Sequence, residues 1–104
     1  MSKFATTIER VRTHPGEVLQ EEFMVPLGLS GNQLAHALKI PANRINEIVA
    51  GRRAVTADTA LRLSRYFGTT AEFWLNLQQA HDLSKVVVES LAAIEHDVQP
   101  RRVA

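Results

Sequence analysis

Residues 29–51 read LSGNQLAHALKIPANRINEIVAG, and this stretch decides the fold. Apolar residues recur along it at the spacing of two short helices joined by a tight turn: Leu34, Leu38, Ile40, Ile45 and Ile48. The small side chain of Ala35 lets the second helix cross close over the first. This pattern predicts a helix-turn-helix, whose second helix, about residues 41–50, leaves its outer face free to enter the major groove of DNA.

The ends of these two helices carry recognisable signals. Ser30 and Gln33 have the S-x-x-Q spacing of a capping box, which predicts that the first helix begins after Ser30. Lys39 stands at the turn position most often held by glycine, so a left-handed conformation there carries strain. The second helix is predicted to begin near Pro41 and to end at Gly51.

A helix is also predicted before this pair. It opens at residues 14–16, His-Pro-Gly, because the missing N–H of a proline has no intrahelical partner at the first helical position. Leu19 and Phe23 are expected on its buried side. Pro26 is expected to stop the helix and to push Val25 toward an extended conformation.

Two further helices are predicted after the pair. The first has Thr56 as its N-cap and ends at Gly68. Residues 69–72, Thr-Thr-Ala-Glu, have the spacing of a second capping box, which would start the next helix. That helix carries three apolar residues expected to anchor in the core: Phe73, Trp74 and Leu77.

The two ends of the chain are less regular. Residues 1–12 favour extended structure and are expected to form a flexible arm. Residues 86–88, three valines, fit a strand or a helix, but helical spacing favours a helix with this apolar stripe: Leu83, Val87, Leu91 and Ile94. The stripe either covers the last helix or forms a seam between two copies. The expected fold is therefore an all-α, five-helix helix-turn-helix domain over residues 13–83, with a helical extension over residues 84–104.

Composition excludes several classes of protein. The chain has 104 residues, enough for one domain, and no cysteine, so disulfides and thiolate metal sites are excluded. No apolar run approaches the roughly 20 residues that span a membrane. The sequence MSKFATTIER lacks the apolar core of a signal peptide. We therefore expect a cytoplasmic protein with no membrane partner.

Catalytic constellations are not evident in the sequence. His14, His36, His81 and His96 are scattered and lack metal-ligand spacing. The five glycines stand at expected helix ends, not in a loop that could cradle a phosphate. The sequence accordingly predicts no catalytic residue, cofactor site or metal site, and the chain is not expected to be an enzyme.

The net charge is only +1, but it is unevenly distributed. Residues 39–65 hold six basic and two acidic side chains, a formal charge of +4. Residues 66–100 hold one basic and five acidic side chains, a formal charge of −4. A basic middle and an acidic end suit a protein with two different partners, although two solvated faces would give the same pattern.

The predicted second helix of the pair has an outward polar face. Asn43, Asn46 and Glu47 point outward, with Arg44 on the flank. Asparagine can pair bidentately with adenine, and arginine with guanine or phosphate, so this face suits base reading. A solvated helix face is the alternative. Glu47 either accepts from a cytosine or pairs with Arg44.

Arg52 and Arg53 follow directly after the glycine that ends this helix. Two arginines at that place can clamp a phosphate beside the groove. They can also compensate the negative end of the helix dipole, and both roles are compatible.

Residues 14–83 resemble the HigA family of antitoxins, which belong to the Xre, lambda-repressor-like helix-turn-helix superfamily. Three segments carry the resemblance: HPGEVLQEEFMVPLGLS, LAHALKIPANRINEIVAGRRAVTADTALRLSRYFG and AEFWLNLQQAHDL. It implies a homodimer that represses its own operon through a palindromic operator in double-stranded DNA. It also implies a HigB-type toxin partner, a messenger-RNA-cleaving endonuclease that acts at the ribosome. The alternatives are a stand-alone Xre-type regulator without a toxin and, more remotely, an enzyme; a neighbouring toxin gene would separate the first two.

Carried over by position, the resemblance assigns two sets of DNA contacts. The base-reading set is Ala42, Asn43, Arg44 and Asn46. The phosphate-contacting set is Ser30, Gly31, Asn32, Arg52 and Arg53. The chain departs from the family pattern at Lys39, which replaces the usual glycine, and at Pro41, which replaces a capping serine or threonine.

Overall fold

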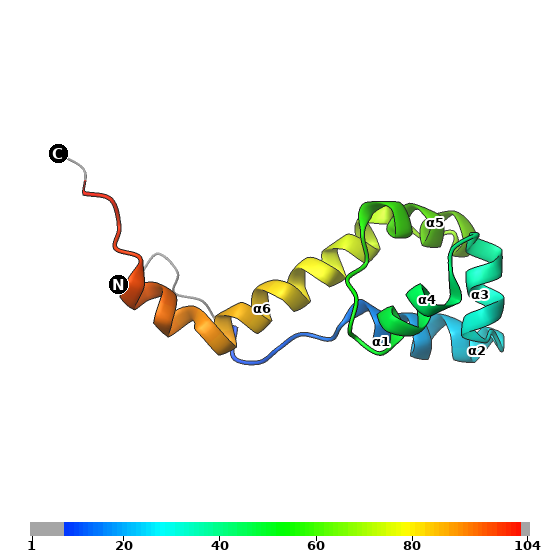
Figure 1. The fold of residues 1–104 in the computed structure, drawn as a ribbon, viewed down its shortest axis with the longest axis horizontal. Helices are drawn as coiled ribbons and strands as arrows, with labels where there is room; N and C mark the ends of the chain where they lie inside the picture. The colour runs from blue at the N-terminus through cyan, green and yellow to red at the C-terminus, as the bar shows by residue number, and fades with distance from the viewer. Residues whose placement is uncertain (1–7, 103–104) are drawn as a thin grey trace.

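The computed structural model describes residues 8–102, and within that range every regular element is helical (Figure 1). The elements in chain order are α1 (Pro15–Val18), η1 (Leu19–Met24), α2 (Val25–Leu27), α3 (Gly31–Leu38), α4 (Ala42–Val49), α5 (Ala57–Phe67) and α6 (Ala71–Asp97). The first three follow one another without a break and form a single helical rod. The predicted all-α fold of five helices is therefore confirmed.

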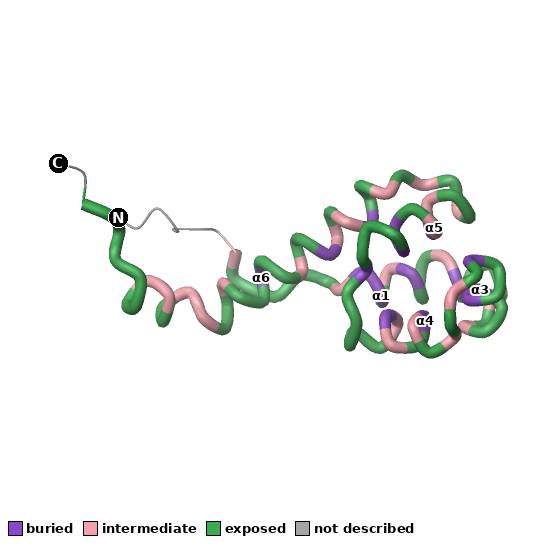
Figure 2. The backbone as a smooth tube through the Cα atoms, turned by 45° about the horizontal axis from the view of Figure 1, so that its top comes forward, coloured by how far each residue is buried: buried purple, intermediate pink, exposed green. Residues whose placement is uncertain are grey.

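The molecule consists of a head and a stalk. Its extents are 57 × 25 × 21 Å, and the long dimension comes from α6, which continues far past the other helices (Figure 1). Buried segments gather in the head, while the second half of α6 stays exposed or half-buried (Figure 2). The predicted C-terminal extension is thus helical as far as Asp97, and it is part of α6 rather than a separate helix. No helix in the described range is long and apolar enough to cross a membrane.

The first rod contradicts the prediction that Pro26 stops the helix. Val25 is helical, with φ −61° and ψ −51°, and the rod runs through Pro26 to Leu27 before Gly28 turns left-handed at φ 65°. The reason is the wider π-helical turn of η1, in which the Val25 N–H donates to the Gln20 carbonyl five residues back. A proline ring clashes with the carbonyl four residues earlier in a regular α-helix, and the widened turn relieves that clash.

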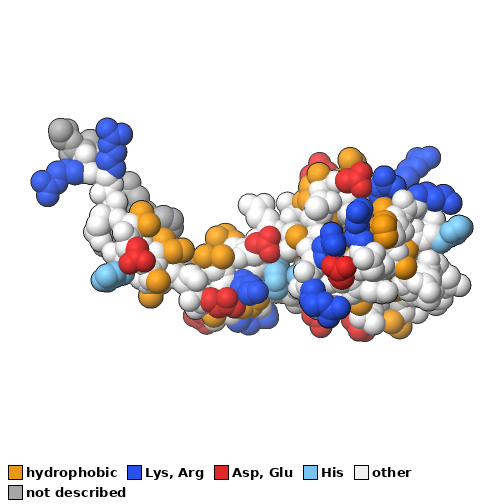
Figure 3. Space-filling model, viewed as in Figure 1, with side chains coloured by type: hydrophobic (Ala, Val, Ile, Leu, Met, Phe, Trp, Pro, Cys, Tyr) orange, Lys and Arg blue, Asp and Glu red, His pale blue; other side chains and the backbone are white. Residues whose placement is uncertain are grey.

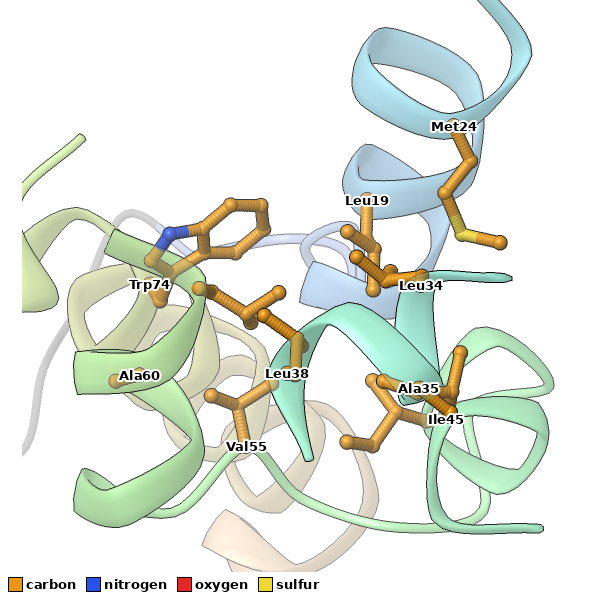
Figure 4. Packing of buried hydrophobic residues seen from close by; sticks show 11 residues of the cluster. Leu19, Met24, Leu34, Ala35, Leu38, Ile45, Val55, Ala60 and Trp74 are labelled. Carbon is orange, nitrogen blue, oxygen red and sulfur yellow. The ribbon is translucent and has the colours of Figure 1, made fainter. Parts of the chain in front are cut away.

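The core of the head is a cluster of apolar side chains drawn from every helical rod (Figure 4). Trp74 of α6 is fully buried in it, as predicted, and its Nε1 donates to the Thr69 hydroxyl at 2.8 Å. Phe73 was expected to be a core anchor but is 37% exposed, although its ring contacts that of Trp74. Leu77 is half-buried against the cluster.

The second capping box is also corrected. Thr70, not Thr69, is the N-cap of α6, and its hydroxyl accepts from the Phe73 N–H at 3.1 Å. Thr69 instead supplies the acceptor that the buried indole of Trp74 needs. Glu72 consequently stands one position too early to complete a capping box.

Lys39 adopts the left-handed conformation expected of the turn between α3 and α4, with φ 60° and ψ 43°. It is the single non-glycine residue with positive φ in the described range. The Lys39 N–H donates to His36 and the Ile40 N–H donates to Ala35, so the turn closes the end of α3 in a Schellman arrangement.

Replacing Lys39 with glycine should raise the free energy of unfolding by up to about 1 kcal/mol. Left-handed backbone costs an L-residue roughly 1–2 kcal/mol, and glycine loses part of that gain, about 0.5–1 kcal/mol, through its extra freedom in the unfolded chain. Urea unfolding at fixed salt measures the change. Lys39→Ala retains the strain and is the control. A Lys39→Gly protein no more stable than Lys39→Ala would show that the turn is unstrained.

Candidate nucleic-acid interface

α3 and α4 form the predicted helix-turn-helix. Leu34, Ala35, Ile45 and Ile48 are all buried between these helices and the rest of the head. Ala35 is 2% exposed, as expected for a small residue at the point where two helices cross closely. The apolar side of α4 is therefore fixed, and its polar side faces away from the core.

The start of α4 shows how the chain accommodates proline in place of a capping hydroxyl. Pro41 occupies the N-cap position with φ −63° and ψ 142°, and it makes no side-chain cap hydrogen bond. Its extended backbone is compatible with the fixed φ of proline, so α4 begins at Ala42. Ala42 itself is half-buried against the core.

The polar side of α4 presents the residues that the sequence assigned to base reading. Asn43 and Asn46 are exposed, and Arg44 is half-buried. Asn46 also lies beside the start of α3: a Cβ added to Gly31 would come within 2.5 Å of its Oδ1. The structure thus brings one residue of the predicted base-reading set next to the predicted phosphate-contacting start of α3.

The capping box at the start of α3 is confirmed. The Ser30 hydroxyl accepts from the Gln33 N–H at 3.1 Å, and the Ser30 N–H donates to Gln33 Oε1 at 2.9 Å. Both polar groups of Ser30 are therefore engaged within the chain. The N–H groups of Gly31 and Asn32, in the first turn, have no intrahelical partner and remain for an anion at this helix end.

The end of α4 turns the chain sharply. Gly51 is left-handed at φ 76°, its N–H donates to Ile48, and the Arg52 N–H donates to Glu47, both at 2.9 Å. This is a Schellman motif, and it brings Arg52 and Arg53 alongside the last turn of α4. Both arginines are exposed there.

Glu47 pairs with Arg53 rather than with Arg44. Arg53 Nε donates to Glu47 Oε2 at 3.2 Å, because the turn at Gly51 brings Arg53 back over the last turn of α4. An ion pair this exposed contributes little to stability, but it orients the arginine side chain.

Basic side chains are prominent on the head, where acidic and apolar ones also lie, while the stalk shows apolar, acidic and some basic side chains (Figure 3). Not every basic residue of the middle segment is available to a partner. Arg62 donates from Nε to Asp58 and from Nη1 to the Leu38 carbonyl, each at 2.8 Å, and so caps the end of α3. The uneven charge predicted from the sequence is present, but part of it is neutralised within the head.

Sequence reasoning missed Gln78, which fastens the loop after α4. Its side chain is buried, its Oε1 accepts from the Val55 N–H at 2.8 Å, and its Nε2 donates to Asp82 at 2.9 Å. This amide ties the loop that carries Arg52 and Arg53 to α6. Its position four residues after Trp74, on the same inner side of the helix, is the signal that could have found it.

His14 and His81, scattered in the sequence, meet in the structure. Their ring centroids lie 4.8 Å apart in an edge-to-face arrangement where the start of α1 approaches α6. Within residues 8–102, no group of three or more histidine, aspartate or glutamate side chains could hold a metal ion.

Residues 21–74 match a family described as helix-turn-helix. Virulence-associated protein I of Dichelobacter nodosus is 60% identical over 70 residues, which are 67% of this chain and 65% of that protein. The chain thus matches just under two thirds of the length of that relative.

Two solved structures share the fold over nearly their whole length. An addiction module antidote protein of the HigA family from Coxiella burnetii is 50% identical with a TM-score of 0.80, covering 88% of this chain and 99% of that one. The antitoxin HigA of Pseudomonas aeruginosa, solved with the higBA promoter, is 42% identical with a TM-score of 0.81, covering 86% and 98%.

Proposed function

The chain belongs to the helix-turn-helix family of HigA antitoxins, and on this premise we propose that it represses its own operon and neutralises a HigB-type toxin. Repression would occur through a palindromic operator, and neutralisation through direct binding, both in the cytoplasm. Neither role needs a catalytic residue or a cofactor. The proposed binding to DNA rests on one observation, the exposed polar face of α4 with Asn46 beside the start of α3. That arrangement supports simultaneous contact with bases and with a phosphate.

Base reading is assigned to the polar face of α4. Asn43 and Asn46 can each pair bidentately with an adenine, and Arg44 can reach guanine or phosphate. Ala42 offers only a methyl group, which suits an apolar contact with thymine. We assign Glu47 the task of orienting Arg53, since its carboxylate already accepts from that arginine.

Phosphate binding is assigned to two places on either side of this face. The Gly31 and Asn32 N–H groups lie at the positive end of α3, and Ser30 supports them by closing the capping box. Arg52 and Arg53 lie beyond the end of α4, on a loop that Gln78 holds to α6. Contacts of both kinds would fix the orientation of α4 in the groove.

Asn43→Ala and Asn46→Ala should each weaken operator binding by about 1–3 kcal/mol and leave binding to random DNA nearly unchanged, as measured by fluorescence anisotropy.

The double change Arg52→Ala with Arg53→Ala should weaken binding to both DNAs and flatten the salt dependence by roughly one to two units of slope. An unchanged slope would mean that these arginines serve only the helix end. Fluorescence anisotropy over a salt series measures both effects. Asn76→Ala, an exposed asparagine on α6, is the matched control. Equal losses on operator and random DNA for the α4 variants would remove them from the base-reading set.

A palindromic operator calls for two copies of the chain. Half-sites lie about 34–36 Å apart, so two helix-turn-helix units must be held at that separation. On α6, the predicted stripe of Leu83, Val87, Leu91 and Ile94 falls within about 80° around the helix. Leu83 is 54% exposed and the other three are half-buried. We assign this stripe to a two-fold seam with a second copy, so the extension over residues 84–104 would serve dimerisation.

Leu83→Glu should convert the dimer to monomers, because it would place two carboxylates in a desolvated seam. Leu83 is exposed in the single chain, so the head should still fold. Ala92→Glu introduces the same charge about 180° around the helix and should leave the dimer intact. Sedimentation equilibrium distinguishes these states. A dimeric Leu83→Glu protein would move the seam to another surface.

The toxin is assigned to the acidic sides of α6. This helix holds five acidic side chains and one basic one, a formal charge of −4. Such a surface attracts a basic RNA-cleaving protein and raises its association rate. The competing surface is the arm over residues 1–12, which could add a strand to a toxin sheet. Residues 1–7 of that arm lie outside the described residues, and Arg12 already binds α6.

Glu89→Lys with Glu95→Lys should abolish rescue of cells that express the toxin, and rising salt should slow toxin association with the unaltered protein. Both residues lie off the apolar stripe, so dimerisation should persist. Glu17→Lys with Glu21→Lys makes the same charge change on the first rod and should preserve rescue. Deletion of residues 2–10 should also preserve it. Loss of rescue on that deletion, in a protein that still folds and binds operator, would assign the toxin to the arm instead.

A further inference from the structure

His14 caps the start of α1 through its ring. Its Nδ1 accepts from the Gly16 N–H at 2.9 Å. An imidazole nitrogen can accept only when it carries no proton, and both ring nitrogens carry protons in the cation. The cap therefore exists only while His14 is neutral.

His81 of α6 holds the chain just before that cap. Its Nδ1 lies 2.8 Å from the Arg12 carbonyl, which can only accept, so this nitrogen is the donor. Ser84, one turn further along α6 and fully buried, accepts from the Arg12 N–H at 2.7 Å and donates to the His81 carbonyl at 2.9 Å. Both backbone groups of Arg12 are thus bound to α6. The contact made by His81 survives protonation, whereas the cap made by His14 does not.

The same turn packs against the end of α4. A side chain at Gly16 would overlap the carbonyl of Ile48 in the last turn of that helix. The ring of His14 stands next to Gly51, where an added Cβ would lie 3.9 Å from its Cγ. The capped turn over residues 14–16 therefore supports the end of the helix to which base reading is assigned.

We propose that His14 and His81 form a protonation-sensitive latch, which fastens the segment before α1 to α6 and seats the start of α1 against the end of α4. Protonation of His14 breaks the cap, because the cation cannot accept from Gly16. The turn over residues 14–16 then no longer holds Arg12 in place against His81 and Ser84, so the latch opens from the cap side even though those two bonds do not themselves titrate. The inference concerns the folded chain itself, and it stands or falls independently of operator and toxin binding.

The surroundings of His14 favour its neutral form. Burial lowers the pKa of His14, His81 lowers it further, and Asp82 opposes them. A cleft of about 150 Å³ beside the ring is lined by further charged groups from the loop after α4 and from α6: Arg52, Arg53, Asp82 and Lys85. On its own rod the nearest charged group in sequence is Glu17, which is exposed.

The direction of the pH effect follows from this lowered pKa. In the unfolded chain His14 takes up a proton near the ordinary value of 6.5, while the folded chain resists protonation until lower pH. The stability that the neutral cap contributes is complete above 6.5. It is lost as the pH falls below that value and levels off beneath the pKa of the folded protein.

The test compares the protein with His14→Asn, because asparagine is a good N-cap that does not titrate. In urea unfolding, the unaltered protein should lose roughly fivefold in its folded-to-unfolded ratio as the cap is lost between about pH 7.5 and 5.5. His14→Asn should lack this component. His36→Asn, at an exposed position on α3, is the matched control and should behave as the unaltered protein does. Over the same range, amide exchange should show falling protection factors at Gly16 and Arg12 in the unaltered protein only.

Three results would overturn the latch. The first is an equal pH dependence in His14→Asn and the unaltered protein. The second is constant protection at Gly16. The third is a loss of protection at Gly16 without any at Arg12, which would leave a helix cap and no latch. If His14→Asn fails to fold, NMR titration of the unaltered protein decides: the Gly16 amide shift must follow the His14 ring, and independent titration contradicts the proposal.

Discussion

The burial of Ile45 and Ile48 against Leu34 and Ala35 is the contact on which the rest of the structure depends. An eight-residue helix such as α4 is too short to be stable alone, so its helicity comes from this packing. Once the apolar side of α4 is buried, its polar side must face the solvent. The close crossing over Ala35 also brings Asn46 beside the start of α3, and so joins the residues assigned to bases and to phosphates on one surface.

Hydrogen-bonded turns at the helix ends fix the course of the loops between helices, which the core packing alone does not determine. Left-handed residues at Gly28, Lys39 and Gly51 close the first rod, α3 and α4, each with a hydrogen-bonded turn. The turn at Gly51 directs the two arginines back along α4, and Gln78 then anchors the following loop from within α6. Buried polar groups are expensive unless they are paired, and both ends of the Gln78 amide are paired. The loop that carries Arg52 and Arg53, the arginine loop, is therefore held against the head.

α6 links all the parts of the molecule. Its first half carries Trp74 into the core and Gln78 to the arginine loop, and its middle binds the segment before α1 through His81 and Ser84. Its second half leaves the head and presents an apolar stripe and acidic sides. One continuous helix thus connects the head, whose α4 face is assigned to DNA, with the surfaces assigned to a second copy and to the toxin.

The sequence by itself determined the helix-turn-helix, the capping box at Ser30, the left-handed Lys39 and the burial of Trp74, because each depends on residues a few positions apart. The structure decided which of several local alternatives the chain takes and what distant residues do together. Pro26 stays helical because the π-helical turn of η1 is wider than an α-helical turn. Thr69 accepts a hydrogen bond from the Trp74 indole instead of capping α6. Glu47 meets Arg53 because a turn returns the chain. Gln78, His14 and His81 acquire their roles only where α6 passes the arginine loop and the start of α1, and local spacing carries no information about that approach.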